Sequence, residues 1–204
     1  MSPTIRAFIA IEFSIAFRQH LDNVIQRISK SIPDRTVNWV QPDNIHITLK
    51  FLGDVPTDHI PQINTALDNA LRRFDLFKFT ASGLGCFPNP RRPRVIWAGV
   101  DEAGGRRMIA LASAVEAALN PLGYLREDRP FAPHITLGRV RRETQPREAA
   151  RVGIVVAAQP IEQWGVEPVT AAYVMQSELK SGGPIYTPLQ RIDLTDREDL
   201  PGLK

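Results

Sequence analysis

The chain has 204 residues, 43% of them hydrophobic and 23% charged, with 25 Lys and Arg residues against 22 Asp and Glu residues. This composition excludes intrinsic disorder, and the length suits one large domain or two closely packed lobes. The formal net charge of +3 agrees with a nucleic-acid partner but does not require one.

Hydrophobic periodicity and turn residues predict alternating strands and helices along the chain. The first half is expected to contain a strand over residues 5–11, a helix that begins after Ser14 and reaches residue 30, strands over 39–40 and 45–52, a helix over 57–74 and a strand over 76–84. The second half continues with a strand over 95–100, an alanine-rich helix after Gly104 and Gly105, a strand over 134–140, a helix over 146–157 and two late strands. No flexible linker separates the halves, so we expect one domain, residues 1–204, of the α+β class.

The single cysteine, Cys86, cannot form an internal disulfide, which fits a reducing compartment. We expect Cys86 to be a small buried hydrophobic residue rather than a nucleophile. Residues 1–12 lack the basic leader and long apolar run of a signal peptide, and no stretch has the length of a membrane span. These observations predict a cytoplasmic protein with no membrane contact and no obligate protein partner.

The tetrapeptide His-Ile-Thr-Leu occurs twice, at residues 46–49 and 134–137, in a chain with four histidines and 11 threonines. The two copies are 88 residues apart, which matches equivalent positions in two half-length units. We therefore predict two pseudo-symmetric lobes, each a mostly antiparallel sheet with helices outside, that face each other across a central active-site cleft. Each lobe would contribute one histidine motif to that cleft.

Each copy is expected to lie on a β-strand, because β-branched and large apolar residues surround it. Alternation in the first strand places His46, Thr48 and Lys50 on one face and Phe51 on the other, toward a core. An imidazole can give or take a proton near neutral pH, and a neighbouring hydroxyl can donate a hydrogen bond to an anionic oxygen. Two such pairs at one site would bracket a phosphate group.

Five segments carry a wider pattern: Ile-His-Ile-Thr-Leu-Lys-Phe-Leu-Gly (45–53), Phe-Pro-Asn-Pro-Arg-Arg-Pro-Arg-Val (87–95), Pro-Phe-Ala-Pro-His (130–134), Phe-Ile-Ala-Ile (8–11) and Ser-Gly-Gly-Pro-Ile-Tyr (181–186). Together they extend over nearly the whole chain. In these segments the chain resembles the bacterial and archaeal RNA 2′,3′-cyclic phosphodiesterases, also called 2′,5′ RNA ligases, of the two-histidine phosphoesterase superfamily.

The resemblance implies the two-lobed fold and hydrolysis of a terminal 2′,3′-cyclic phosphate to a 2′-phosphate, without a metal or cofactor. In several members it also implies a reversible 2′,5′ RNA ligation. By the same resemblance, His46 is the proton donor to the leaving 3′ oxygen and His134 is the proton acceptor that activates water, while Thr48 and Thr136 hold the non-bridging phosphate oxygens. The implied partner is an RNA with a 2′,3′-cyclic phosphate end, such as a tRNA fragment. One histidine must begin protonated and the other neutral, so we expect a bell-shaped pH profile.

Two other functions fit the same motifs. A phosphodiesterase that acts on a small cyclic or linear nucleotide would use the same histidine pair, whereas a non-catalytic RNA-binding protein would use only the basic residues. Two distant histidines are too few for a zinc site, and Asp43 and Asp54 beside the first motif are typical of turns. The sequence therefore predicts no metal site.

Arginines and aromatic residues supply candidate RNA contacts. Three basic clusters are candidates to follow the RNA phosphates: Arg91, Arg92 and Arg94; Arg106 and Arg107; and Arg139, Arg141 and Arg142. Strict alternation turns Arg139 away from the face of His134, so a phosphate contact by Arg139 requires a bulge or a strand end. Four aromatic residues are candidates to stack a terminal base, although a core of this size consumes most such side chains: Phe8, Trp39, Phe131 and Tyr186.

Overall fold

The computed structural model describes residues 2–195 and has the predicted α+β architecture. Two antiparallel sheets, ordered β3-β1-β8-β9 and β2-β6-β5-β4-β7, contain the nine strands of the described residues. The strands are β1 (Thr4–Glu12), β2 (Val37–Trp39), β3 (His46–Pro56), β4 (Phe77–Phe87), β5 (Val95–Val100), β6 (Ile135–Val140), β7 (Gln163–Val169), β8 (Ala171–Lys180) and β9 (Gly183–Asp193). The helices are α1 (Ile15–Ser29), α2 (Ile60–Leu71), α3 (Glu102–Leu119) and α4 (Pro146–Ala157), with short 3-10 turns η1 (Pro42–Asn44), η2 (Thr57–His59) and η3 (Asn120–Leu122).

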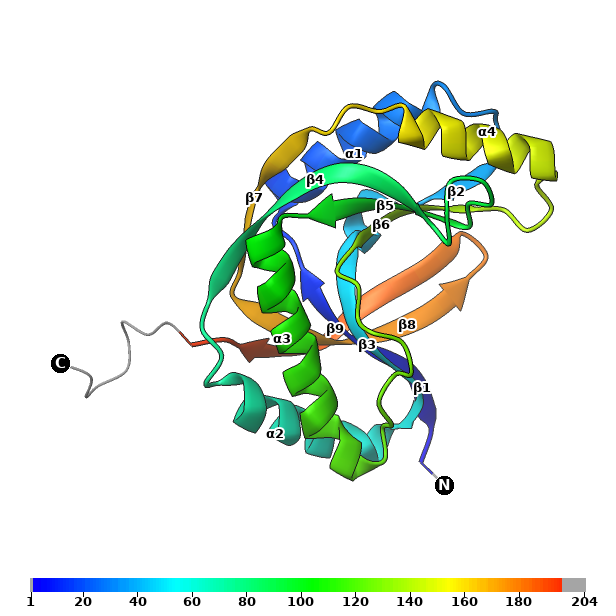
Figure 1. The fold of residues 1–204 in the computed structure, drawn as a ribbon. Helices are drawn as coiled ribbons and strands as arrows, with labels where there is room; N and C mark the ends of the chain where they lie inside the picture. The colour runs from blue at the N-terminus through cyan, green and yellow to red at the C-terminus, as the bar shows by residue number, and fades with distance from the viewer. Residues whose placement is uncertain (1, 196–204) are drawn as a thin grey trace.

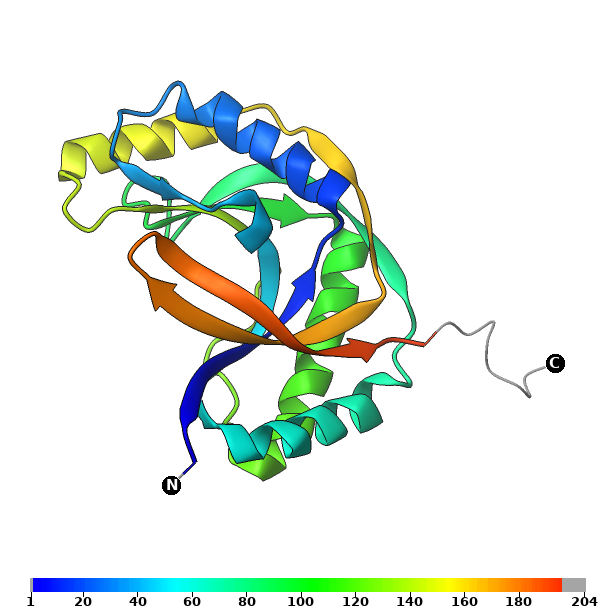
Figure 2. The same cartoon turned by 180° about the vertical axis from the view of Figure 1, so that it is seen from behind.

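The two sheets do not coincide with the two halves of the chain. The four-stranded sheet joins the early strands β1 and β3 to the last two strands, β8 and β9. Helix α1 packs on β7 and α4 packs on β4, so both cover the five-stranded sheet, and Figures 1 and 2 show these helices side by side. Helix α2 lies at the opposite side of the molecule, and α3 runs from β4 past β3 to α2 (Figure 1). Apart from the short strand β2 between α1 and β3, the order strand, helix, strand, helix occurs twice, as β1-α1-β3-α2 and as β5-α3-β6-α4.

Local sequence signals explain most of the helix boundaries. Ser14 caps α1 as predicted, because its hydroxyl accepts a hydrogen bond from Phe17 N at 3.3 Å. Helix α4 has the predicted bounds. Helix α3 begins before Gly104 rather than after it, because Asp101 is the N-cap residue and its carboxylate accepts a hydrogen bond from Gly104 N.

Three further expectations differ from the structure. The second helix ends at Leu71 instead of residue 74, and its predicted first turn is the 3-10 turn η2. The strand predicted over 76–84 continues to Phe87, because it pairs with β5 along that length. Up to residue 195, three late strands are present instead of two, since β7 precedes the hairpin of β8 and β9.

One hydrophobic cluster takes in buried residues of both sheets and of all four helices, including Ile9, Ile47, Leu67, Met108 and Ile135. Burial of this continuous core holds the two sheets together as one unit. A second, small cluster lies on the other face of the four-stranded sheet and consists of Phe8, Ala10 and Met175 with Tyr173 and Tyr186 packed against it. Within residues 2–195, no helix is long and apolar enough to cross a membrane.

Candidate active site

The two histidine motifs lie on neighbouring strands of different sheets. His46 begins β3, an edge strand of the four-stranded sheet, and His134 immediately precedes β6 of the five-stranded sheet. Strands β3 and β6 contact each other, so the copies that are 88 residues apart in the sequence meet where the sheets meet. We call the face of these strands that carries both histidines and both motif threonines the histidine face.

Both imidazoles are oriented in the same way. The Nδ1 of His46 lies 2.8 Å from the carbonyl oxygen of Asn44, and the Nδ1 of His134 lies 2.7 Å from that of Ala132. Because a carbonyl oxygen only accepts, each Nδ1 carries the proton, and the neutral ring presents Nε2 as the acceptor. The Nε2 of His46 lies 3.0 Å from the Thr48 hydroxyl oxygen, which confirms that this pair shares a face.

A β-bulge follows the motif in each strand. Leu49 is left unpaired between Thr48 and Lys50, which face Ala10 and Ile9 of β1, and Leu137 is left unpaired between the β6 residues that face Trp97 and Ile96. An extra residue reverses the alternation of the side chains that follow. The strict alternation expected for residues 45–52 is therefore wrong beyond Leu49.

The bulges correct the predicted positions of Lys50 and Phe51. Lys50 is 3% exposed and points away from the histidine face. Its ammonium pairs with Glu116 of α3 at 2.9 Å, on the opposite side of the strand. Phe51 is 60% exposed and lies on the histidine face, with its ring 6.2 Å from that of Phe8. Lys50 therefore does not contact a phosphate held between the histidines.

The same reversal brings Arg139 to the site. Arg139 is exposed and follows the bulged Leu137 by two residues, so it shares the face of Thr136. Within residues 2–195 it pairs with no carboxylate, which leaves its charge available for an anion. The bulge that the sequence analysis required for a phosphate contact by Arg139 is present.

Burial and nearby cations lower the pKa of both motif histidines. The pKa of His46 is lowered to about 4, and burial is the largest cause. The charges of Arg139, Arg18 and His134 contribute to this lowering, whereas the hydrogen bond to its backbone carbonyl acts in the opposite direction. Burial also lowers the pKa of His134, against the effect of its own carbonyl, and Arg139 adds to that shift. Both rings are therefore neutral at pH 7, and Arg139 lies close enough to act on each.

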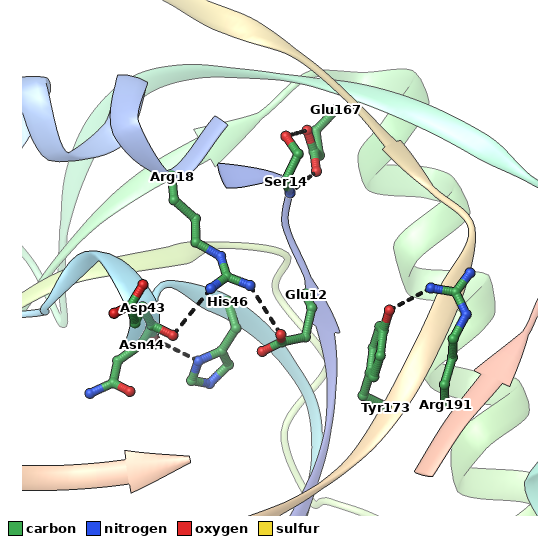
Figure 3. A network of polar contacts seen from close by, with 9 residues as sticks. All are labelled: Glu12, Ser14, Arg18, Asp43, Asn44, His46, Glu167, Tyr173 and Arg191. Carbon is green, nitrogen blue, oxygen red and sulfur yellow. Dashed lines mark hydrogen bonds and ion pairs between the residues drawn. The ribbon is translucent and has the colours of Figure 1, made fainter. Parts of the chain in front are cut away.

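Arg18 of α1 is a residue of the site that the sequence analysis did not single out. Its guanidinium pairs with Glu12 at 3.0 Å and donates to the carbonyl oxygen of Asp43 at 3.4 Å, beside His46 (Figure 3). The neighbouring carbonyl, that of Asn44, holds His46. Arg18 thus fixes the segment that orients this imidazole. No local motif marks Arg18, because α1 contacts η1, the turn before β3, only in the folded protein.

Aromatic rings pack against both histidines. Phe8 and Tyr186 each have ring centroids 5.1 Å from the centroid of His46, and Phe87 has its centroid 5.0 Å from that of His134. Burial raises the pKa of Tyr186, and the charges of Arg139 and Arg6 oppose that shift. Of the four predicted stacking candidates, Phe8 and Tyr186 reach the site.

The other two aromatic candidates do not contact the motif histidines. Trp39 packs over Gly138 of β6, and Phe131 packs against the main core. Phe87, which does contact His134, belongs to the segment 87–95 but is not among the four predicted stacking candidates.

The remaining candidates are distributed around this centre. Thr136 is half-buried and faces Trp97 of β5. Arg91, Arg92 and Arg94 are exposed in the turn between Phe87 and β5, so this basic cluster adjoins the ring that packs on His134. Cys86 is buried as predicted, and burial raises the pKa of its thiol to about 11. In the described residues, no group of three or more His, Cys, Asp or Glu side chains could hold a metal ion.

The second basic cluster, Arg106 and Arg107, lies away from the histidine face. Arg106 pairs with Glu102 on α3, and Arg107 stacks on Phe74 with its guanidinium carbon 4.7 Å from the ring centroid. Asp43 and Asp54 lie in η1 and in β3, beside the first motif.

Comparisons with known proteins agree with this geometry. The sequence model of the family described as "LigT like Phosphoesterase" matches two consecutive segments, residues 11–97 and 99–186. Curated relatives named RNA 2′,3′-cyclic phosphodiesterase include one from Methanothermobacter thermautotrophicus, 31% identical over 91% of this chain and 97% of the relative. A second, from Archaeoglobus fulgidus, is 35% identical over 91% of this chain and 98% of the relative.

Solved structures show the same fold. The Thermus thermophilus protein TT0787 superimposes with a TM-score of 0.75 at 28% identity and covers 95% of this chain and 100% of that protein. E. coli LigT, solved in complex with 3′-AMP, superimposes with a TM-score of 0.73 at 28% identity and covers 95% of this chain and 99% of that protein. The resemblance drawn from the sequence is confirmed, and the chain belongs to the LigT-like phosphoesterase family.

Proposed function

We propose that this protein hydrolyses the 2′,3′-cyclic phosphate end of an RNA to a 2′-phosphomonoester without a metal ion. The observation that carries the proposal is the matched pair of imidazoles, each with Nδ1 held on a carbonyl oxygen two residues earlier. Two fixed Nε2 atoms supply the acid and the base that the opening of a cyclic phosphodiester requires. The relatives named RNA 2′,3′-cyclic phosphodiesterase support RNA as the substrate.

His46 acts as the proton donor and His134 as the proton acceptor in this proposal. A water oxygen bonds to phosphorus as its proton passes to His134 Nε2, while the bond from phosphorus to the 3′ oxygen breaks and His46 Nε2 protonates that oxygen. The phosphate remains on the 2′ oxygen. The same sequence, with a 5′ hydroxyl in place of water as the attacking group, would join two RNA ends through a 2′,5′ linkage.

The bound substrate raises the pKa of His46 and so allows this histidine to act as an acid. This ring is neutral in the free protein because its pKa lies at about 4. A phosphate anion beside Nε2 favours the imidazolium, since an opposite charge within a few ångströms raises the pKa of a histidine. Binding of the cyclic phosphate is therefore accompanied by uptake of a proton at His46.

The threonines and Arg139 bind the phosphate. The hydroxyls of Thr48 and Thr136 donate to the non-bridging oxygens, and Arg139 balances the charge that develops on them. Thr48 Oγ1 lies 3.0 Å from His46 Nε2, so it is already within reach of an atom held by that nitrogen. Support for the role of Arg139 comes from its lack of a carboxylate partner within residues 2–195 and from its effect on the pKa of both histidines.

The two motifs and their lobes form one site within one domain. We infer that β1-α1-β3-α2 and β5-α3-β6-α4 are pseudo-duplicated units, since the family model also matches two consecutive segments of similar length. The exposed arginines at 91, 92 and 94 provide a path for the RNA phosphates beyond the reacting end. RNAs with cleaved, cyclic phosphate ends, tRNA fragments among them, are the substrates that this path suits in a cytoplasmic protein.

The first experiment is hydrolysis of a short RNA with a 2′,3′-cyclic phosphate end in the presence of excess chelator. We expect the wild type to form a 2′-phosphate and expect His46→Ala and His134→Ala to lose turnover by about 10²-fold or more. Turnover that needs added metal, or that survives both substitutions, would overturn the mechanism. Equal rates for a cyclic mononucleotide and a longer RNA would favour a small-nucleotide phosphodiesterase, and salt-sensitive binding without turnover would favour an RNA-binding protein.

A further inference from the structure

Lys50 connects the first motif strand to the segment that leads into the second histidine. Its ammonium donates to Glu116 Oε1 at 2.9 Å and to the carbonyl oxygen of Leu125 at 2.6 Å. The same Glu116 oxygen accepts from the backbone N–H of Glu127 at 3.0 Å. One buried ion pair therefore holds the chain at two points beyond the end of α3.

The segment held in this way has few hydrogen bonds to the rest of the protein, although Phe131 packs against the main core. Residues 124–134 contain neither helix nor strand. In the part of the chain that the structure describes, residues 125–133 form hydrogen bonds to other elements only through Lys50 and Glu116. The carbonyl of Ala132, which holds His134 Nδ1, belongs to this segment. Displacement of this segment would therefore displace the carbonyl oxygen that orients the His134 imidazole.

A reciprocal contact exists on the other side of the site. The backbone N–H of Val40, ahead of the first motif, donates to the carbonyl oxygen of Leu137 at 2.9 Å. Leu137 is the bulged residue of β6, and Lys50 directly follows the bulged Leu49 of β3. Each motif strand thus fixes the segment that delivers the other histidine.

We propose that the Lys50–Glu116 pair is a positioning device for His134, which it holds through Leu125 and Glu127. The inference rests on the proposed role of His134 as the base. Lys50 does not touch the substrate in this account. Its position after the bulge of β3 makes the geometry of His134 depend on the strand that carries His46.

The kinetic test uses Lys50→Met, which keeps an unbranched side chain but removes the ammonium. We expect kcat for a cyclic-phosphate dinucleotide to fall about tenfold to a hundredfold while KM stays within about twofold, because displacement of a catalytic group by about 1 Å costs on that order. Glu102→Gln removes the exposed ion pair with Arg106 on the same helix and is the matched control. Glu116→Gln, which keeps an acceptor oxygen, is expected to reduce kcat less than Lys50→Met does. It is the test variant if Lys50→Met does not fold.

A second readout in the substrate-free protein separates positioning from activity. Long-range ¹H–¹⁵N spectra of the imidazoles report the tautomer and the titration of each ring. In Lys50→Met we expect the His134 signals to lose the fixed Nδ1–H tautomer and to titrate closer to the ordinary pKa, while the His46 signals stay unchanged. Unchanged His134 signals, or equal changes at both rings, would overturn the inference. Absence of turnover in the wild type would contradict the proposed function. The imidazole spectra would then still test whether Lys50 and Glu116 position His134.

Discussion

Phe51 and Arg139 occupy the same position in their strands, five residues after His46 and His134 and two residues after a bulged leucine. Both side chains lie on the histidine face, yet one is an apolar ring and the other carries a positive charge. Two identical tetrapeptides therefore build an asymmetric site. The aromatic side, with Phe8 and Phe51 near His46, suits a sugar or base, and the charged side suits the phosphoryl oxygens.

The first prediction concerns this charge. Arg139→Gln should lower kcat/KM for a cyclic-phosphate dinucleotide by about 10- to 100-fold, because a hydrogen bond to a charged group contributes about 1.5 to 3 kcal/mol. Steady-state kinetics at constant ionic strength provides the measurement. Arg147→Gln, which removes an exposed charge from α4 in the same lobe, should change the rate by less than about twofold. Equal small effects of both substitutions would show that Arg139 contributes only to the overall positive charge of the protein and does not bind the phosphate.

Sequence reasoning located the two histidines, the threonines beside them and the α+β class, because each rests on short-range patterns. The face shared by His46 and Thr48 needs only the alternation of a strand, and the cap at Ser14 needs only a hydroxyl before an apolar helix. Patterns of this kind depend only on residues that are close together in the sequence.

The positions of Lys50 and Arg139 could not be read in the same way. A bulge at Leu49 or Leu137 leaves no local mark, since leucine suits either register and the extra residue appears only against the partner strand. Arg18 and Phe87 reach the histidines through the packing of α1 and β4, over separations of 28 and 47 residues. Contacts of that kind depend on the tertiary arrangement alone.

The second prediction concerns the pH dependence of turnover. One proton on the histidine pair is required, and both pKa values are lowered in the free protein, so kcat/KM should decline as the pH rises above a value below 6.5. The bound phosphate anion raises the pKa of the neighbouring ring, so the decline of kcat should occur at higher pH than the decline of kcat/KM. Both profiles can be measured between pH 4.5 and 9. A flat profile from pH 5 to 9 would contradict the acid and base roles.

The third prediction concerns stability in acid. The pKa of His46 falls from 6.5 to about 4 on folding, so the unfolded chain takes up a proton in this window that the folded protein does not. The stability linked to this group is complete above pH 6.5 and is lost progressively as the pH falls from about 6.5 to about 4. Between pH 7 and 4.5 the loss should be about 2 to 3 kcal/mol.

Urea unfolding at these two pH values measures that loss. His46→Gln should reduce the difference between the two free energies of unfolding, because glutamine does not titrate. His20→Gln, which replaces an exposed histidine of α1, should leave the difference as in the wild type. An equal pH dependence in all three proteins would show that other groups cause the acid sensitivity.

The fourth prediction contrasts two helical glycines. A Cβ at Gly153 of α4 would overlap the backbone carbonyl of Pro90, in the turn that follows Phe87, whereas a Cβ at Gly105 of α3 would meet only Val100 Cγ2 at 3.6 Å. Alanine stabilises a helix interior by up to about 1 kcal/mol relative to glycine, and overpacking against backbone costs about 1 to 3 kcal/mol. Gly105→Ala should therefore raise the Tm and Gly153→Ala should lower it, by about 2 to 4 °C per kcal/mol in a chain of this size.

Activity separates the two variants further. Displacement of Pro90 would move the ring of Phe87, which packs 5.0 Å from the centroid of His134, so Gly153→Ala should also lower kcat. Gly105→Ala lies away from both motifs and should keep the wild-type kcat. Thermal unfolding by circular dichroism and assays below both midpoints provide the measurements. A Gly153→Ala protein with raised Tm and full activity would show that α4 shifts freely against this turn. It would also show that the turn does not hold His134 in place.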